Sequence, residues 1–168
     1  MTTLADKQQP KPNLLHPVHC LAFGFGAGCV PKAPGTMGTL VAVVFYLLLL
    51  PLSQSWYIGV TLIVVLAGIG ICGWSARQLG VHDHPGIVWD EIAGYLITMI
   101  AAPKGVVWIV LGFGLFRLFD IIKPWPIAYI DRKVGGGLGI MLDDVVAGLA
   151  AFACMQLIQA SGLLLIGL

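Results

Sequence analysis

A long run of uncharged residues constrains this chain more than any other feature. Between Lys32 and Arg77 there are 44 consecutive residues without a charged side chain. As helix they would extend about 66 Å, enough for two bilayer crossings and a turn. A polar turn at 51–55 would separate helices over 39–50 and 56–73. With 58% hydrophobic and 10% charged residues, the chain lies outside the composition of soluble domains, and we predict an integral membrane protein.

The other apolar segments complete an all-helical prediction. A second hairpin is expected over 87–102 and 105–122, and a last helix runs from near Val145 to the C-terminus. The stretch 18–30 is apolar but too short to span a bilayer, which favours a re-entrant or interfacial helix. We therefore predict an all-α polytopic protein with about four main membrane helices plus this short N-terminal element.

Charge placement predicts the topology. With both hairpins turning back at the far side, Lys104 is the one cation there, and the positive-inside rule makes the other side cytoplasmic. We expect one helical membrane domain over 18–168 after a cytosolic tail over 1–17. The net charge of +1, without clustered Lys and Arg, argues against a nucleic-acid partner. The four scattered cysteines indicate neither a disulfide framework nor a CxxC metal site.

Seven of the eight carboxylates fall in segments expected to meet on the cytosolic side; these are Asp83, Asp90, Glu91, Asp120, Asp131, Asp143 and Asp144. Two adjacent pairs, 90–91 and 143–144, stand where apolar helices are expected to begin. Neighbouring carboxylates repel there unless a cation or a proton intervenes, and a hard divalent cation with oxygen ligands is the economical solution. Helix capping is the competing explanation, but it must be invoked twice.

The segment PKAPGTMGT over 31–39 directly precedes an apolar helix. Free backbone N–H groups and the helix dipole favour an anion there, and Lys32 adds a positive charge. Two glycines permit close backbone approach and two threonines can cap the helix; the four residues are Gly35, Thr36, Gly38 and Thr39. An ordinary Pro/Gly turn with a threonine cap stays open as an alternative. The Walker pattern is absent.

The segment RLFDIIKPWPI over 117–127 carries both signs of charge. Arg117, Asp120 and Lys123 recur at a spacing of three, so Arg117 and Asp120 share one face of a helix that Pro124 ends. Such a face offers a metal ligand beside phosphate-binding cations. A structural ion pair at the membrane interface is the alternative.

The segment VHDHPGIVWDE over 81–91 places two histidines around Asp83. His82 and His84 could order ligands, donate to a phosphate or transfer a proton; merely solvated loop histidines are the alternative. Zinc is disfavoured because no third soft ligand has matching spacing.

In order and spacing, four motifs together resemble those of the phosphatidylglycerophosphatase A family of bacterial membrane lipid phosphatases: PGTMGT, VHDHPGIVWDE, RLFDIIKPWPI and GGGLGIMLDD. The resemblance covers roughly residues 18–160. It implies an all-helical, multi-pass enzyme of the bacterial inner membrane, with its active site on the cytosolic side. Such an enzyme removes the terminal phosphate of phosphatidylglycerophosphate in phospholipid biosynthesis and requires Mg²⁺. Membrane lipids would surround it.

The resemblance and the residues together give a set of expected roles. The expected Mg²⁺ ligands are Asp90, Glu91, Asp120, Asp143 and Asp144. The expected phosphate-binding residues are Lys32, Arg117 and Lys123, with Gly35, Thr36, Gly38 and Thr39 of the first motif. The expected catalytic residues are Asp83, Asp90, His82 and His84. Attack by water and an aspartyl-phosphate on Asp83 or Asp90 stay open as routes.

Other function classes fit the residues less well. An alcohol phosphotransferase acting on a CDP-lipid would carry a DG-x-x-AR type of pattern, which is absent. A small ion- or proton-coupled transporter could use the carboxylates, but it needs acids at several depths, and no inverted repeat is apparent. A structural subunit, whose charges only fix topology, is the third alternative.

Overall fold

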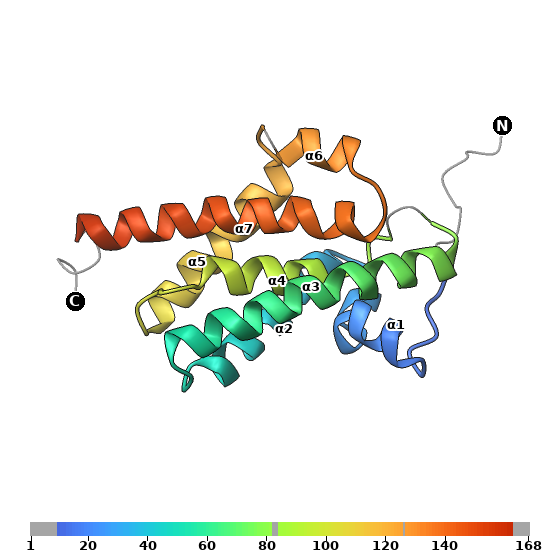
Figure 1. The fold of residues 1–168 in the computed structure, drawn as a ribbon, viewed down its shortest axis with the longest axis horizontal. Coiled ribbons are helices and arrows are strands. Elements are labelled where there is room, and N and C mark those ends of the chain that lie inside the picture. Colours follow the sequence, from blue (N-terminus) through green and yellow to red (C-terminus); the bar gives the residue numbers. More distant parts are fainter. Residues whose placement is uncertain (1–9, 82–83, 126, 163–168) are drawn as a thin grey trace.

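A computed structural model of the chain describes residues 10–81, 84–125 and 127–162, apart from the side chains of 130–132. The described chain is all-α, as predicted (Figure 1). Its elements are α1 (Pro17–Ala22), the 3₁₀ segment η1 (Gly24–Cys29), α2 (Pro34–Leu49), α3 (Gln54–Leu79), α4 (Trp89–Thr98), α5 (Val106–Ile122), α6 (Ile127–Lys133) and α7 (Gly136–Ser161).

Two long helices, α3 and α7, run along the molecule (Figure 1). Each has 26 residues and is, by length and composition, apolar enough to cross a membrane; α2, with 16 residues, is a shorter apolar helix. Large hydrophobic side chains point outward from the bundle, including Leu48 (70% exposed), Ile63 (66%) and Val110 (63%). An apolar exterior of this kind suits a lipid environment better than water. The first expected hairpin is present, with its turn after Leu50.

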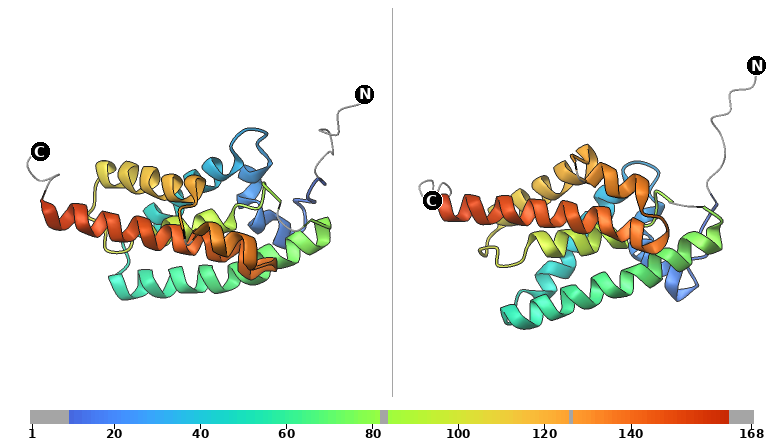
Figure 2. Two further views of the ribbon diagram at one scale, coloured as in Figure 1. Left: turned by 90° about the horizontal axis from the view of Figure 1, so that it is seen from above. Right: turned by 45° about the horizontal axis from the view of Figure 1, so that its top comes forward.

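Helix α4 forms the centre of the bundle. It contacts α2, α3, α5 and α7, and eight of its ten residues are buried (Figure 2). Apart from Asp90 and Glu91 in its first turn, its residues are apolar, aromatic or small, as is typical of a buried helix. The expected helix over 87–102 is therefore too long: α4 ends at Thr98, and Ala101 has a positive φ of 55°. With about 15 Å of length, α4 is too short to span a bilayer.

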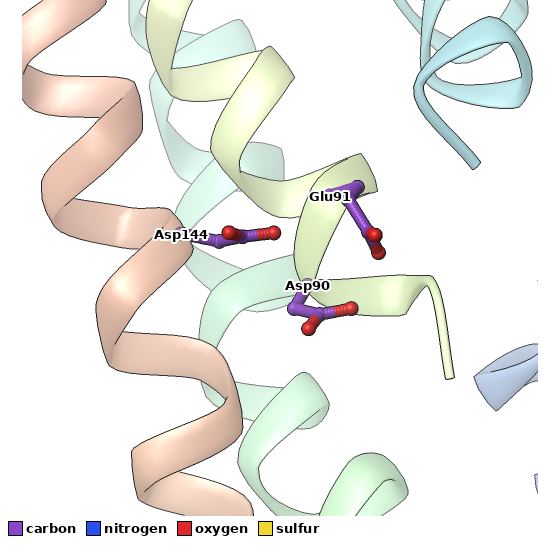
Figure 3. A group of neighbouring side chains, drawn as sticks. All are labelled: Asp90, Glu91 and Asp144. Carbon is purple, nitrogen blue, oxygen red and sulfur yellow. The ribbon is translucent and has the colours of Figure 1, made fainter. Parts of the chain in front are cut away.

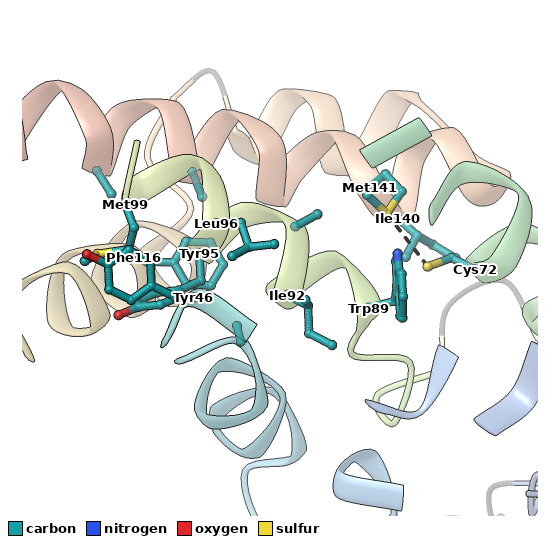
Figure 4. Close-up of a cluster of buried hydrophobic side chains, with 14 of the residues drawn as sticks. Tyr46, Cys72, Trp89, Ile92, Tyr95, Leu96, Met99, Phe116, Ile140 and Met141 are labelled. Atoms are coloured by element: carbon teal, nitrogen blue, oxygen red, sulfur yellow. Dashed lines mark hydrogen bonds between the residues drawn. The ribbon is translucent and has the colours of Figure 1, made fainter. Parts of the chain in front are cut away.

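The core around α4 has two parts (Figure 4). Near the first turn of α4, Trp89 lies with Cys72 of α3 and Met141 of α7. Toward the C-terminal end of α4, Tyr95 packs edge-to-face against Tyr46 of α2, with ring centroids 6.4 Å apart. These contacts fix α4 between helices that are distant in the sequence.

The expected re-entrant segment over 18–30 is short, as predicted, but it is two pieces. Helix α1 ends at Ala22, and η1 follows with a kink inside it, where φ is positive at Phe25 and Gly26. Helix α2 then begins at Pro34, earlier than expected, with proline at its favoured first position. Its N-cap is Ala33, and no side chain caps it. The expected threonine caps are therefore wrong, because Thr36 and Thr39 lie inside the helix.

The last helix also begins earlier than expected, at Gly136 rather than near Val145. The glycines at 136, 137 and 139 lie in its first turn. A Cβ on Gly137 would overlap the carbonyl oxygen of Ile69, so α7 packs backbone to backbone on α3 at this point. As a result, the acidic pair 143–144 lies well inside α7.

The helix ends that carry the polar motifs meet at one end of the bundle. The starts of α2 and α4 are adjacent, since Gly35 lies against Glu91, and the start of α7 lies against α3 near Gly73. Lys104 lies at the opposite end, beside Leu49 and Gln54. We call these the carboxylate end and the Lys104 end.

Candidate metal centre

Three carboxylates from two helices converge at the carboxylate end (Figure 3). Asp90 and Glu91 occupy the first turn of α4, and Asp144 points toward them from α7. One oxygen of each lies within 4.8 Å of the others. Glu91 Oε2 and Asp144 Oδ2 are buried without a hydrogen-bond partner. Because an unpaired buried carboxylate oxygen is costly, this arrangement favours a cation among the three groups.

Helix capping does not explain these acids. The N-cap of α4 is Val88 and that of α7 is Gly135, and neither makes a side-chain cap. The expectation that residues 143–144 open the last helix is also wrong. Asp143 and Asp144 are buried inside α7, with 7% and 3% exposed. The capping alternative therefore fails for both pairs.

The electrostatics of Glu91 point the same way. Burial, and next the charge of Asp144, raises the pKa of the Glu91 carboxyl to about 8, although a hydrogen bond with Asp90 and the charge of Arg117 act in the other direction. Helix α4 lies outside the two candidate membrane spans. A carboxyl in this setting either keeps a proton at neutral pH or ionises beside a bound cation.

Arg117 and Asp120 share a face of α5, as their spacing predicts. The Arg117 guanidinium contacts the Asp120 carboxylate and lies 3.8 Å from Glu91 Oε1. Its Nε is buried without a hydrogen-bond partner. Asp120 also reaches the Asp144 carboxyl. Arg117 and Asp120 thus border the three carboxylates, and Arg117 retains donor capacity for an anion.

Lys123 and Asp143, which we expected to bind phosphate and metal, are paired with each other. Lys123 Nζ donates to Asp143 Oδ2 at 2.6 Å. Lys123 ends α5 in a left-handed conformation with φ 45°. The pair therefore joins the end of α5 to α7, beside the carboxylate cluster.

The first motif contributes backbone rather than side chains to the site. A Cβ on Gly35 would overlap Glu91 Oε1 and lie 2.9 Å from Arg117 Nη1. The Thr39 hydroxyl donates to the Gly35 carbonyl at 2.9 Å, so it is used within α2. The motif's remaining expected residues lie nearby: Lys32 is exposed, Thr36 is half-buried, and Gly38 packs against Val88.

Both ring nitrogens of His84 contact backbone groups of the protein. Gly86 N–H donates to His84 Nδ1 at 3.0 Å, and Nε2 lies 3.1 Å from the Pro10 carbonyl, to which it donates in the matching tautomer. The ring also packs against Phe23. These contacts hold the loop before α4 to the N-terminal segment. The other two expected residues of this loop, His82 and Asp83, lie outside the described residues.

Comparison with known proteins identifies the family of this chain. A sequence profile described as phosphatidylglycerophosphatase A matches residues 20–159. The chain belongs to the phosphatidylglycerophosphatase A family. Its predicted family membership is confirmed, and the matched span contains all the residues of the carboxylate cluster.

Two relatives bear the family's name. Phosphatidylglycerophosphatase A of Escherichia coli K12 is 42% identical over 154 residues, covering 91% of this chain and 90% of the relative. That of Haemophilus influenzae is 43% identical over 151 residues, covering 89% and 93%. A relative from Bacteroides thetaiotaomicron, 36% identical over 141 residues and covering 79% and 87%, carries the provisional name phosphatidylinositol-3-phosphatase. No solved structure matches this chain significantly.

Proposed function

We propose that this chain hydrolyses the terminal phosphate of phosphatidylglycerophosphate at a Mg²⁺ centre formed by Asp90, Glu91 and Asp144, on the cytosolic side of the bacterial inner membrane. The lipid phosphatase activity follows from family membership and from relatives that match about nine tenths of the chain. The metal ligands, the phosphate-binding residues and the side of the membrane rest on the arguments below.

One observation carries the metal centre: one carboxylate oxygen from each of the three residues lies within 4.8 Å of the others, and buried Glu91 Oε2 and Asp144 Oδ2 lack a hydrogen-bond partner. Oxygen donors of this kind suit a hard divalent cation. Mg²⁺, when bound, would neutralise phosphate charge and polarise the phosphoester. Asp120 lies next to Asp144 and is the fourth candidate ligand. Asp143, in its ion pair with Lys123, is better placed to hold α5 against α7.

Arg117 is the main candidate for holding the substrate's terminal phosphate. Its guanidinium is oriented by Asp120 and Glu91, and its buried Nε is without a hydrogen-bond partner. Charge-assisted bonds from arginine to phosphate are strong and directional. The first turn of α2 adjoins this group at Gly35, where backbone N–H groups favour an anion. Exposed Lys32 precedes this turn and adds positive charge at its entrance.

The candidate residues for proton transfer lie in the loop before α4. We keep His82 and Asp83 as candidates from their positions in the family's motif. His84 engages both ring nitrogens with backbone groups, so we assign it to holding this loop. Asp90 remains both a metal ligand and a candidate nucleophile. Acid quench after reaction with ³²P-labelled substrate distinguishes the routes, since only an aspartyl-phosphate route leaves label on the protein.

The charge distribution supports a cytosolic site. The cations of the motifs lie toward the carboxylate end, whereas Lys104 lies at the opposite end. By the positive-inside rule, this distribution favours the carboxylate end as the cytosolic one. The lipid chains would stay along the apolar exterior while the headgroup reaches the site. Among the described residues, the carboxylates gather at one end of the bundle, which disfavours a transporter with acids at several depths.

Phosphate release from phosphatidylglycerophosphate by the purified chain tests the proposal. We expect release with Mg²⁺, loss of release with EDTA, and loss in Asp90→Asn and Asp144→Asn. Lys104→Gln, at the opposite end, is the control and should keep the native rate. Full activity of Asp144→Asn, or activity that persists in EDTA, would contradict the metal centre.

Asp143→Asn separates the two roles considered for Asp143. If Asp143 only pairs with Lys123, the variant loses stability but keeps the native Mg²⁺ requirement, which is the result we expect. If Asp143 is a ligand, the variant needs more Mg²⁺, as Asp144→Asn would.

A further inference from the structure

Helices α4 and α7 touch backbone to backbone at two glycines. A Cβ on Gly148 would overlap the carbonyl oxygen of Gly94, with the carbonyl carbon 3.1 Å away. A Cβ on Gly94 would lie 2.7 Å from the carbonyl oxygen of Asp144 and 2.8 Å from Phe116 Cζ. The Thr98 hydroxyl lies 3.0 Å from the Gly94 carbonyl oxygen and 3.4 Å from that of Gly148. Neither glycine position therefore admits a side chain without moving a helix.

Each of these glycines follows a carboxylate of the metal centre by four residues. Asp90 precedes Gly94 on α4, and Asp144 precedes Gly148 on α7. Residues four apart lie on the same face of a helix, one turn from each other. The carboxylates therefore stand one helical turn from the point where the two backbones meet.

The two helices share a short sequence pattern at this crossing. Residues 90–94 read DEIAG and residues 144–148 read DVVAG, so both follow Asp-x-aliphatic-Ala-Gly. The alanines, Ala93 and Ala147, are both fully buried. The same arrangement of an acid, small residues and a glycine is thus used on both sides of the metal centre.

We propose that the Gly94–Gly148 crossing is a positioning device for the metal centre. It sets the gap across which Asp90 and Asp144 share one cation. Gly94 and Gly148 act only through the spacing of the carboxylates. The inference depends on the proposed function for the identity of the ion, and on the structure for the geometry.

The physical reason lies in the narrow requirements of Mg²⁺. This ion demands near-ideal octahedral geometry at about 2.0–2.1 Å, whereas Ca²⁺ accepts looser arrangements at about 2.3–2.6 Å. A methyl group wedged between the two glycines would push the helices apart and move Asp90 and Asp144 away from each other. Since glycine is among the least favourable residues inside a helix, its presence at this crossing on both helices calls for a compensating role.

Other helical glycines in this chain provide matched controls. A Cβ on Gly70 of α3 or on Gly114 of α5 would meet no atom within 4 Å. Replacing either by alanine makes the same chemical change in a long apolar helix without displacing a neighbour. A difference between these variants and Gly148→Ala therefore reports the crossing and not the loss of a glycine.

Metal binding by the purified full chain tests the inference. Mn²⁺ binding is measured by the loss of the EPR signal of free Mn²⁺. Mg²⁺ binding is measured by its competition with Mn²⁺. We expect Gly148→Ala to weaken Mg²⁺ binding about ten-fold or more, the size typical of changes to residues that orient metal ligands without binding the metal. Gly70→Ala and Gly114→Ala should bind as the native chain does. Equal Mg²⁺ affinity in Gly148→Ala and the native chain would overturn the inference.

A rescue variant separates positioning from general packing. Asp144→Glu adds one methylene, so in the Gly148→Ala background its carboxylate can reach across the widened gap. We expect the double variant to bind Mg²⁺ more tightly than Gly148→Ala, whereas Asp144→Glu alone binds more weakly than the native chain. A double variant that binds no better than Gly148→Ala would count against positioning.

If Gly148→Ala does not fold, as judged by circular dichroism, Thr98→Val provides the second test. It removes the hydroxyl that lies against both carbonyls without adding bulk at the crossing. A smaller but measurable loss of Mg²⁺ affinity is then expected, and native affinity would overturn the inference. Failure of the native chain itself to bind Mn²⁺ or Mg²⁺ would instead contradict the metal centre of the proposed function.

Discussion

The two ends of the bundle differ in how their buried polar groups are satisfied. At the Lys104 end, Tyr57 donates to the Leu96 carbonyl at 2.8 Å, and Gln156 donates to the Ile100 carbonyl at 3.1 Å. At the carboxylate end, buried oxygens of Glu91 and Asp144 have no hydrogen-bond partner. Buried polar groups are normally paired. The difference therefore indicates that the Lys104 end needs no ligand, whereas the carboxylate end binds one.

The largest expected effect is at Asp144. Asp144→Asn should lower the rate of phosphate release by about a hundred-fold or more, because metal-mediated charge stabilisation is worth several kcal/mol. In EDTA the same variant should unfold at a temperature no lower than that of the native chain, because an amide replaces a buried carboxyl that has no cation beside it. Phosphate release and thermal unfolding measure the two effects. A variant that loses both activity and stability in EDTA would mean that Asp144 is structural.

Gly35 should give the next largest effect. Gly35→Ala places a methyl group against Glu91 and Arg117, so we expect about 1–3 kcal/mol of destabilisation from overpacking and a marked loss of activity. Gly59→Ala in α3, where a Cβ would meet no atom within 4 Å, is the control. Denaturant unfolding and phosphate release check this. If both variants kept the stability and the phosphate-release rate of the native chain, Gly35 would not border the site.

The stability of the carboxylate end should also depend on pH. The pKa of Glu91 is raised from 4.5 to about 8 by burial and by Asp144. The folded chain therefore binds more protons than the unfolded chain between these values, and stability without metal should fall as pH rises from about 4.5 to about 8. Saturating Mg²⁺ should reduce this slope, because it stabilises ionised Glu91. Thermal unfolding across this range, with EDTA or with Mg²⁺, measures it; equal slopes would contradict a cation beside Glu91.

The smallest expected effect is at the Lys104 end. Tyr57→Phe removes the hydrogen bond to Leu96 and should cost about 1 kcal/mol of stability. The Mg²⁺ requirement and the rate of phosphate release should equal those of the native chain, because the Lys104 end does not contact the carboxylates. Denaturant unfolding and the phosphate assay check both. A changed Mg²⁺ requirement would mean that the two ends are coupled.

Prediction from the sequence succeeded where local signals were strong. The helix expected over 105–122 is α5, Val106–Ile122, because Gly105 and Pro124 delimit it. It failed at α4, where the apolar run continues past Thr98 although the helix does not. It failed again at the start of α7, which was expected near Val145 but lies at Gly136. Contact with Ile69 and Gly73 of α3, which the sequence does not reveal, explains why residue 137 is glycine.

The candidate site was predicted in part. The adjacency of Asp90, Glu91 and Asp144 was expected from their shared end of the bundle, and Arg117 with Asp120 from their spacing. The pairing of Lys123 with Asp143 was missed, because it joins residues 20 apart across α6. The roles of Gly94 and Gly148 were also missed, although the shared Asp-x-aliphatic-Ala-Gly pattern was a visible signal.

The apolar, all-helical character of this protein, the residues of its motifs and its family can be inferred from the amino-acid sequence. These depend on composition, spacing and local propensity, which are written along the chain. The tertiary structure alone decided that α4 is a short central helix, that Asp144 faces Asp90 from within α7, and which cations are already paired. The physical reason is that these features depend on how closely helices distant in sequence approach each other, and a glycine permits that approach without specifying its partner.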